Sequence, residues 1–304
     1  MNRKEKFTGV FPALYACYDE QGEVSSERVR NLTRHLVEKG VQGLYVGGSS
    51  GECIYQGVAE RKQVLEAVMA EARGEIAVIA HVACNNTRDS QELAAHAESL
   101  GVDAIAAIPP IYFRLPDHGI AAYWNAISAA APNTDFIIYN IPQLAGVALT
   151  VSLLKEMMKN PRVIGVKNSS MAVLDIAQWL ETGGDDFVVF NGPDEQFLSG
   201  LAAGAQGGIG GTYGVMPELF LKVQHLFGEG RMAEAREIQA EITRIILNMC
   251  AAKGNLYAVM KAILRLKGVD IGDVRAPLSS LVPQDQAIVE ACAAQIDAAT
   301  HKYC

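Results

Sequence analysis

The sequence is 304 residues long, with 50% hydrophobic residues and a formal net charge of -8 at pH 7. A chain of this size can bury one large core or two moderate ones, and the acidic balance disfavours nucleic acid or anionic membrane as a partner. No apolar run reaches the length of a signal peptide or a membrane-spanning helix, so we expect a cytoplasmic protein with a small-molecule ligand.

Strand-like apolar runs alternate with amphipathic helical runs as far as residue 230. The predicted strands cover residues 11–17, 43–46, 76–81, 103–108, 136–139, 163–167, 187–190 and 207–210. The predicted helices cover residues 25–39, 58–72, 87–100, 117–130, 150–159, 174–181, 194–203 and 216–227. Ser25 or Ser26 is the expected N-cap of the first helix.

Eight strand–helix units predict a (β/α)8 TIM barrel over residues 1–230, because a doubly wound sheet more often contains five or six units. From Arg231 onward the strand pattern stops. Helical periodicity at residues 232–252, 256–266 and 283–299 predicts a C-terminal helical extension over residues 231–304.

Polar residues directly follow most of the predicted strands. In a barrel of this kind the active site lies at the carboxyl ends of the strands, so these residues are expected to meet there. The segments concerned are residues 47–52, 109–112, 139–142, 167–170, 191–195 and 210–214.

Lys167 ends the strand predicted at residues 163–167. An amine held between apolar walls loses hydration, so its pKa falls and its neutral form can add to a ketone to give a Schiff base. A lysine in a surface loop is the simpler interpretation of one residue, but the strand-end position favours catalysis.

Residues 47–52 read Gly-Gly-Ser-Ser-Gly-Glu, a loop that could hold an anion such as a carboxylate through hydroxyl and amide donors. The loop has no P-loop lysine and no complete dinucleotide pattern, and a plain tight turn is the alternative. Tyr139 could transfer protons beside the lysine or could be a core tyrosine. Taken alone, Tyr112 and His81 are better explained as structural residues.

The cysteines and histidines show no metal-like or redox-like spacing, so we predict free thiols and no metal. Cys53, beside the glycine loop, is the one cysteine considered as a reactive thiol, although simple packing is the better explanation.

Four motifs carry a family resemblance: residues 47–52, Tyr-Asn-Ile-Pro at 139–142, Val-Lys at 166–167 and Asn-Gly-Pro-Asp-Glu at 191–195. The chain resembles the pyruvate-dependent class I aldolases of the dihydrodipicolinate synthase and N-acetylneuraminate lyase family. The resemblance implies a Schiff base on Lys167 with no other cofactor, substrates that are pyruvate or a 2-keto acid and an aldehyde, and a homotetramer. It also implies that Tyr139 shuttles protons, that Ser49 relays them, and that Tyr112 reaches the site of a neighbouring subunit.

Within the family, residues 139–147 and Gly192, Asp194 and Glu195 resemble the N-acetylneuraminate lyases. Leu144 stands where the synthases place an arginine that grips a carboxylate, and leucine cannot make that pair. Gly211 replaces a serine of the lyases, so one sugar hydrogen bond would be lost or supplied by water. The resemblance gives a substrate-binding set of Ser49, Ser50, Gly51, Ser169, Gly192, Asp194, Glu195 and Ile209.

We therefore expect a lyase that converts N-acetylneuraminate to N-acetylmannosamine and pyruvate. A 4-hydroxy-tetrahydrodipicolinate synthase and a 2-keto-3-deoxy sugar acid aldolase or dehydratase remain alternatives of the same chemistry. A small-molecule-binding barrel without catalytic activity remains the non-enzyme alternative, against which the pairing of Lys167 with Tyr139 counts.

Overall fold

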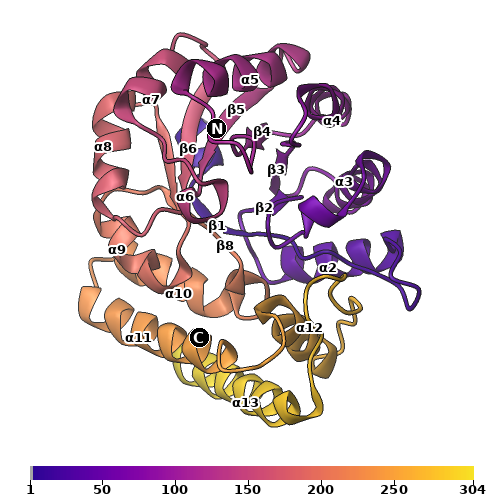
Figure 1. Cartoon of the computed structure of the whole chain (residues 1–304). Helices are drawn as coiled ribbons and strands as arrows, with labels where there is room; N and C mark the ends of the chain where they lie inside the picture. Colours follow the sequence, from indigo (N-terminus) through magenta and orange to yellow (C-terminus); the bar gives the residue numbers. More distant parts are fainter. Residues whose placement is uncertain (1–2) are drawn as a thin grey trace.

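The computed structural model describes residues 3–304, in which eight parallel strands form a barrel surrounded by helices (Figure 1). The strands are β1 (Gly9–Pro12), β2 (Gly43–Val46), β3 (Ala77–His81), β4 (Ala104–Ala107), β5 (Asp135–Asn140), β6 (Val163–Asn168), β7 (Val188–Asn191) and β8 (Gly207–Gly210). Strands β2 to β8 pair in chain order and β8 pairs with β1, while a bridge between Ala13 and Tyr45 joins the first strand to the second. The predicted (β/α)8 barrel is confirmed.

The longer helices surround the barrel (Figure 1). The helices up to residue 230 are α1 (Arg3–Lys6), α2 (Ser26–Glu38), α3 (Val58–Ala72), α4 (Thr87–Ser99), α5 (Asp117–Ala130), α6 (Pro142–Ala145), α7 (Val151–Met157), α8 (Leu174–Gly183), α9 (Phe197–Ala202) and α10 (Pro217–Gly228). Ser25 is the N-cap of α2, and its hydroxyl accepts a hydrogen bond from the Arg28 amide at 3.3 Å.

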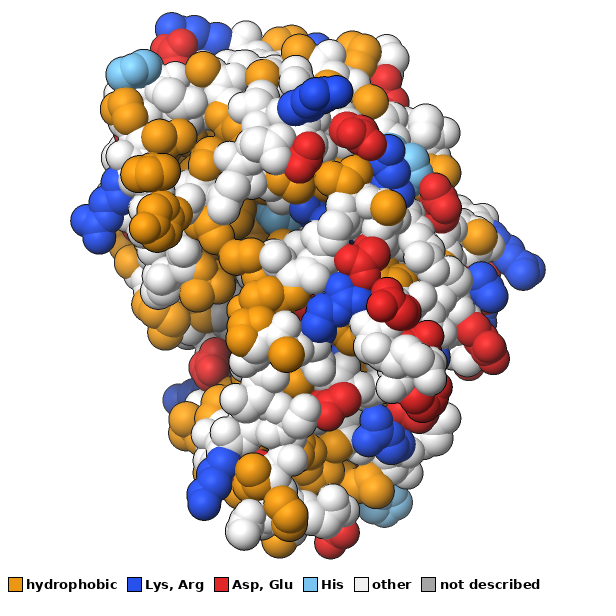
Figure 2. All heavy atoms as spheres, turned by 45° about the vertical axis from the view of Figure 1, so that its right-hand side comes forward, with side chains coloured by type: hydrophobic (Ala, Val, Ile, Leu, Met, Phe, Trp, Pro, Cys, Tyr) orange, Lys and Arg blue, Asp and Glu red, His pale blue; other side chains and the backbone are white. Residues whose placement is uncertain are grey.

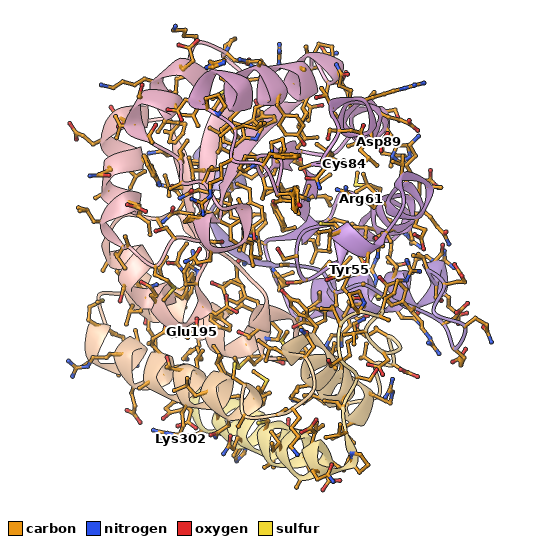
Figure 3. All side chains as sticks on the ribbon, in the orientation of Figure 1. Tyr55, Arg61, Cys84, Asp89, Glu195 and Lys302 are labelled. Atoms are coloured by element: carbon orange, nitrogen blue, oxygen red, sulfur yellow. The ribbon has the colours of Figure 1, made fainter. Side chains whose placement is uncertain are left out.

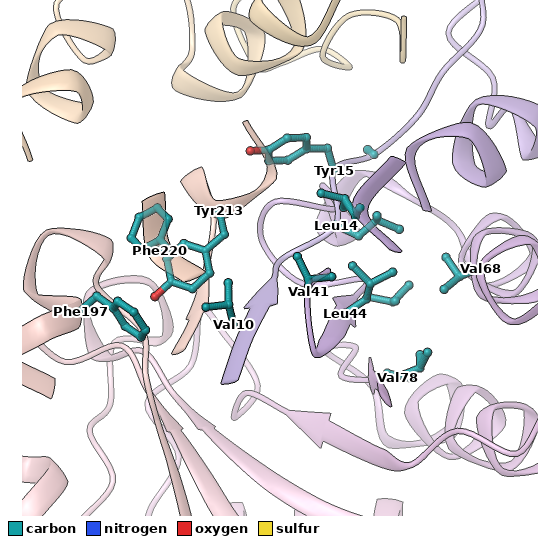
Figure 4. Packing of buried hydrophobic residues seen from close by; sticks show 14 of the residues in the cluster. Val10, Leu14, Tyr15, Val41, Leu44, Val68, Val78, Phe197, Tyr213 and Phe220 are labelled. Atoms are coloured by element: carbon teal, nitrogen blue, oxygen red, sulfur yellow. The ribbon is translucent and has the colours of Figure 1, made fainter. Parts of the chain in front are cut away.

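The strands carry two separate apolar cores, one on each face. Val10 and Phe11 are neighbours on β1, yet Val10 belongs to the core between strands and helices and Phe11 to the core inside the barrel. This division follows from the pleat, which turns successive side chains to opposite faces. Figure 4 shows part of the outer core, with Val10, Leu44 and Val78 packed among the surrounding elements.

The barrel interior is filled with side chains. Phe7, which precedes β1, packs edge-on against Phe190 with ring centroids 6.4 Å apart, and Phe11 packs against the same ring at 5.1 Å. Because this packing occupies the interior, a ligand is confined to the space beyond the carboxyl ends of the strands.

The C-terminal extension contains α11 (Met232–Met249), α12 (Leu256–Leu266) and α13 (Gln286–Tyr303), which lie together against one side of the barrel (Figure 1). Ile238, Ile242 and Val259 of this extension belong to the outer core of the barrel. The apolar packing is therefore continuous across residue 230, and the division into two domains at that point stays a prediction.

Several element boundaries differ from the prediction. The first strand begins and ends earlier than expected, at Gly9 and Pro12, and the helix expected at 194–203 begins with a 3-10 turn before α9. The prediction missed α1, α6 and the 3-10 turns, because a helix of a single turn is too short to show the helical repeat. None of the helices within residues 3–304 is long and apolar enough to cross a membrane.

Candidate active site

Lys167 lies on β6 opposite Tyr139 of β5, and only 4% of its surface is exposed. Its Nζ atom is 3.9 Å from the ring centroid of Tyr139 and 4.1 Å from that of Tyr45. Burial lowers the pKa of Lys167 to about 7, although the charges of Asp194 and Cys53 act in the opposite direction. A large fraction of the amine is therefore neutral, and nucleophilic, near neutral pH.

A β-bulge explains why this lysine points into the barrel. Phe136 of β5 pairs with Val163 and the next residue, Ile137, pairs with Gly165, so Ile164 is an extra residue on β6. Ile164 faces the inner core, and without the bulge the alternation would turn Lys167 toward the helices. The bulge thus re-aims the strand end toward Tyr139.

Gly165 is required at this bulge because the neighbouring strand is very close. A Cβ atom at residue 165 would lie 2.2 Å from the carbonyl oxygen of Val188 on β7, a distance that real Cβ atoms do not show. Any larger residue would push β6 and β7 apart just below the lysine.

Tyr139 is buried beside the lysine, and burial raises its pKa to about 12. Hydrogen bonds with the side chains of Ser49 and Ser169 act in the opposite direction. Ser169 is itself held close by Gly192, where an added Cβ would be 2.1 Å from the serine Oγ. The three hydroxyls form a short path along which a proton can move.

The glycine loop at residues 47–52 follows β2 and turns tightly. Gly47 has φ +74°, and Glu52 also adopts a left-handed conformation, with φ 51°. The Gly51 amide donates to the Gly48 carbonyl at 3.1 Å, so a ligand would have to share that donor. Ser50 is buried and Ser49 half-buried, and their hydroxyls and amides are the better candidates for contacts with an anion.

His81 supports the loop and is not placed to exchange protons with a ligand. Its Nδ1 is 2.8 Å from the Gly47 carbonyl oxygen, and Arg61 donates to the His81 carbonyl at 2.6 Å. Burial lowers the pKa of His81 to about 3, and the Arg61 charge adds to this effect. Arg61 also donates to the sulfur of Cys84 at 3.2 Å, and Figure 3 shows the two side chains close together.

Asp194 is buried after β7, and its carboxylate accepts hydrogen bonds from the Thr212 amide at 2.7 Å and the Thr212 hydroxyl at 2.6 Å. Burial raises the pKa of Asp194 to about 7, while the Thr212 hydrogen bonds oppose the shift. The next residue, Glu195, is exposed and is labelled in Figure 3.

A profile of the Dihydrodipicolinate synthetase family matches residues 6–296. The chain belongs to this family. It is 62% identical over 304 residues to an N-acetylneuraminate lyase from Mediterraneibacter gnavus, covering 100% of this chain and 96% of that protein. Among solved structures, a Ruminococcus gnavus sialic acid aldolase catalytic lysine mutant matches with a TM-score of 0.99 and 61% identity, covering 100% of both chains.

A second solved structure, a Clostridium difficile protein in complex with mannosamine, matches with a TM-score of 0.88 and 29% identity. The match covers 98% of this chain and 99% of that chain. The predicted membership of the dihydrodipicolinate synthase family is thus confirmed.

The structure brings together the residues that this family resemblance predicted around the lysine, with one exception. Lys167, Tyr139, Ser49 and Ser169 form one cluster, in which Lys167 and Tyr139 are buried and the two serines are half-buried. Tyr112 does not join it, because 90% of its surface is exposed and its φ is 85°. It packs edge-on against the exposed ring of Phe113 at 5.1 Å and borders a cavity of about 590 Å³.

Ile209 of β8 lies inside the barrel and pairs with Phe11 of β1. Its side chain belongs to the packed interior, and only 1% of the residue is exposed. Gly192 is half-buried beside Ser169. The roles predicted for these residues in binding substrate stay predictions.

Two residues at the site were missed from the sequence, Tyr45 and Tyr257, while Thr212 lies in the predicted strand-end segment 210–214 but had no predicted role. Tyr45 has a buried hydroxyl without a hydrogen-bond partner within residues 3–304, which marks a polar space beside the lysine. Its position two residues before Gly47 on a strand was the available signal, because alternation then places it inward. Tyr257 comes from α12, far along the chain, and no sequence signal pointed to it.

Cys53 packs near the site, and burial raises the pKa of its thiol, which disfavours the reactive thiolate. This agrees with the packing interpretation. Among the described residues no three His, Cys, Asp or Glu side chains converge as metal ligands. The prediction that the protein needs no metal stays a prediction.

Proposed function

We propose that this chain is a Schiff-base aldolase that cleaves N-acetylneuraminate to N-acetylmannosamine and pyruvate. The observation that carries the proposal is the buried amine of Lys167, enclosed between the Tyr45 and Tyr139 rings at the carboxyl end of the barrel, where burial lowers its pKa to about 7. The names of the relatives support the same reaction, including one solved as a catalytic lysine mutant.

The reaction begins when the Lys167 amine adds to the ketone carbon of the open-chain sugar acid. Loss of water gives an iminium, which withdraws electrons from the adjacent carbon. Removal of the proton from the hydroxyl group one carbon further along lets the carbon–carbon bond break, which releases the aldehyde and leaves an enamine. Protonation of the enamine and addition of water then return pyruvate and the free lysine, so no metal or organic cofactor takes part.

Tyr139 is the proposed acceptor of the hydroxyl proton and its donor in the reverse direction. Its pKa of about 12 keeps it protonated at rest, so it must first pass its own proton on. Ser49 provides that route, because it shares a hydrogen bond with Tyr139 and lies on the same loop as the proposed carboxylate site. In the proposed order, Ser49 and its neighbours can relay the proton to Tyr112 from a second subunit.

The substrate carboxylate is proposed to bind the hydroxyls and amides of Ser49 and Ser50, with Gly51 as a shared donor. These dipoles are fixed before the substrate arrives, so they orient the ketone beside the lysine without reorganisation. Gly192, Asp194 and Glu195 are proposed to contact the hydroxyl tail of the sugar, and Ser169 and Ile209 its middle part.

Leu144 is the observation that separates this proposal from a dihydrodipicolinate synthase. Its side chain is 62% exposed and apolar, so it cannot form a bidentate pair with the carboxylate of a second substrate. The relative that was solved with mannosamine supports an amino sugar instead. A homotetramer in the cytoplasm completes the proposal.

The proposed chemistry is tested by incubating the protein with pyruvate and borohydride and then locating the adduct by mass spectrometry. We expect a reduced pyruvate adduct on Lys167 that is absent from Lys167→Ala and retained in a surface control, Lys159→Ala. Cleavage of N-acetylneuraminate should fall by at least about a thousandfold in Lys167→Ala, because the covalent route is lost. A wild-type protein that forms no adduct would exclude the Schiff-base mechanism.

A further inference from the structure

Helix α12 of the C-terminal extension presents two side chains to the glycine loop that follows β2. Tyr257 and Lys261 are four residues apart and therefore lie on one face of the helix, one turn from each other. Tyr257 shares a hydrogen bond with Ser50, and Lys261 donates to the Glu52 carboxylate at 2.8 Å. The extension thus touches the loop at two of its residues.

The Lys261–Glu52 pair is almost completely buried, with side-chain exposures of 1% and 0%. Both partners have further hydrogen bonds: Lys261 donates to the Asp273 carbonyl at 2.8 Å, and the Arg275 amide donates to the second oxygen of Glu52 at 2.9 Å. The ammonium group also lies 4.8 Å from the Tyr18 ring centroid. Each oxygen of the Glu52 carboxylate is therefore held by the extension.

Because its carboxylate is fixed by the extension, the Glu52 backbone also fixes the conformation of the loop. Glu52 adopts a left-handed conformation that glutamate rarely takes, with φ 51°, and its amide donates to the Ser49 carbonyl at 3.0 Å. Without Lys261 the carboxylate would be buried with its counter-charge removed, and the least costly response is for it to turn toward water. That turn would release the Ser49 carbonyl and widen the loop.

Tyr257 contacts the same loop at Ser50, on the other side of the interface between α12 and the loop. Besides its hydrogen bond with Ser50, its ring lies near Gly211, where an added Cβ would be 3.9 Å from the tyrosine Cε1 and 3.3 Å from the Ser50 Oγ. The Ser50 hydroxyl is consequently held between α12 and the segment that follows β8.

A purely stabilising role is the competing explanation for a buried ion pair, and it explains this pair poorly. Well-packed apolar residues often stabilise a fold as much as, or more than, a buried ion pair, because taking both charges out of water is costly. The pair instead sits at the one loop whose donors are aimed at a substrate carboxylate in the proposed function.

We propose that Glu52 and Lys261 are positioning residues that hold Ser49 and Ser50 in register with the carboxylate of the keto acid, with Tyr257 fixing the Ser50 hydroxyl. This inference rests on the proposed function. It makes the C-terminal extension part of the active site, because its helix determines how well the loop distinguishes a carboxylate from a neutral group.

The test compares the rate of borohydride-trapped adduct formation with pyruvate and with its neutral methyl ester. Wild-type protein should favour pyruvate, and this preference should fall about tenfold in Lys261→Met and in Glu52→Gln, while trapping of the ester changes little. Tyr257→Phe should lower the preference less. Lys261→Arg should restore part of it, and Lys267→Met, which removes an exposed ion pair with Asp297 at the end of the same helix, should leave it unchanged.

The possible outcomes separate the inference from the proposed function. If Lys261→Met does not fold, Glu52→Gln and Tyr257→Phe decide the question, because both keep the shape of the native side chain. An unchanged preference for pyruvate in these two variants overturns the inference while the Schiff-base function stands. Loss of stability with an unchanged preference also overturns it, whereas a wild-type protein that forms no adduct removes the proposed function first.

Discussion

Burial lowers the pKa of Lys167 because the loss of hydration destabilises the charged amine more than the attraction of the surrounding rings stabilises it. A cation over an aromatic face is attracted to it, and two tyrosine rings lie about 4 Å from the Nζ atom. The pKa nevertheless falls to about 7, so the loss of hydration dominates. The rings therefore serve chiefly as walls that exclude water from the nucleophile.

Asp194 adjusts the pH at which this amine becomes reactive. Its charge raises the pKa of Lys167, so Asp194→Asn should lower that pKa and move the midpoint of the pH–rate profile for pyruvate trapping to lower pH, by up to about one unit. Because the two groups titrate in the same range, the wild-type midpoint belongs to the pair. A midpoint that moves to higher pH would contradict this, and Asp185→Asn, at an exposed position, is the control.

Catalytic candidates at strand ends could be predicted where the local sequence alone marks them. Lys167 and Tyr139 were recognised because each ends an apolar run. The Lys261–Glu52 pair and the Thr212–Asp194 hydrogen bonds were not, because their partners lie far apart in the chain and nothing in a local pattern encodes such a contact. Strand-end chemistry can therefore be predicted from the sequence more readily than the contacts that orient it.

A β-bulge in strand β6 directs Lys167 into the barrel. The extra residue at Ile164 reverses the alternation of the strand, so that Val166 faces the outer core and Lys167 the interior. The sequence predicted the strand within one residue of its observed end, but the bulge was not predicted, because Gly165 within the strand is only a weak local sign and the extra residue depends on the register with β5.

Gly165→Ala tests the contribution of the bulge. The new Cβ would meet the Val188 carbonyl oxygen at 2.2 Å, so the variant should lose about 1–3 kcal/mol of stability and most of its pyruvate-trapping activity. Thermal unfolding and borohydride trapping measure the two effects. Gly228→Ala is the matched control, because a Cβ there meets nothing within 4 Å, and a native-like result for both variants would show that the bulge tolerates a side chain.

Long helices and most strands were predicted well, because amphipathic periodicity marks the helices and short apolar runs mark the strands. Helices α3, α5 and α12 and strands β2 and β8 begin and end at the predicted residues. Helix α6 and the 3-10 turns were missed because a single helical turn is too short to show the helical repeat. The barrel class needed only the count and order of the long elements, which is why it could be predicted without these turns.

At the scale of the whole molecule, several large apolar side chains are exposed on the surface. Figure 2 shows hydrophobic side chains gathered around a hollow on one face. The large exposed apolar residues include Ile54, Tyr112, Phe113, Leu144, Met171 and Leu174. Apolar surface of this kind, and the strained backbone of Tyr112, are typical of residues that become covered in an assembly.

In the proposed homotetramer, Tyr112 would supply a proton-relay member to the site of a neighbouring copy. Light scattering should therefore give the mass of a tetramer for the wild type, and Tyr112→Ala should lower the rate of sugar acid cleavage more than tenfold because a relay member is missing. Leu247→Ala, which removes another exposed apolar side chain, should retain both mass and activity. A fully active monomer would contradict the assembly and the relay together.

The barrel closes between β1 and β2, where the pairing of the strands is weaker than a continuous ladder. Here the strands share an isolated bridge at Ala13 and Tyr45. Two backbone hydrogen bonds join them, from the Leu14 amide to the Tyr45 carbonyl at 2.9 Å and from the Gln42 amide to the Val10 carbonyl at 3.1 Å, and the Gln42 side chain also accepts from the Val10 amide at 2.7 Å. A seam with few hydrogen bonds opens at lower free energy than a continuous ladder. Since Tyr45 stands at this seam and its ring lies 4.1 Å from the Lys167 Nζ atom, a local opening of the wall here would also change access to the amine.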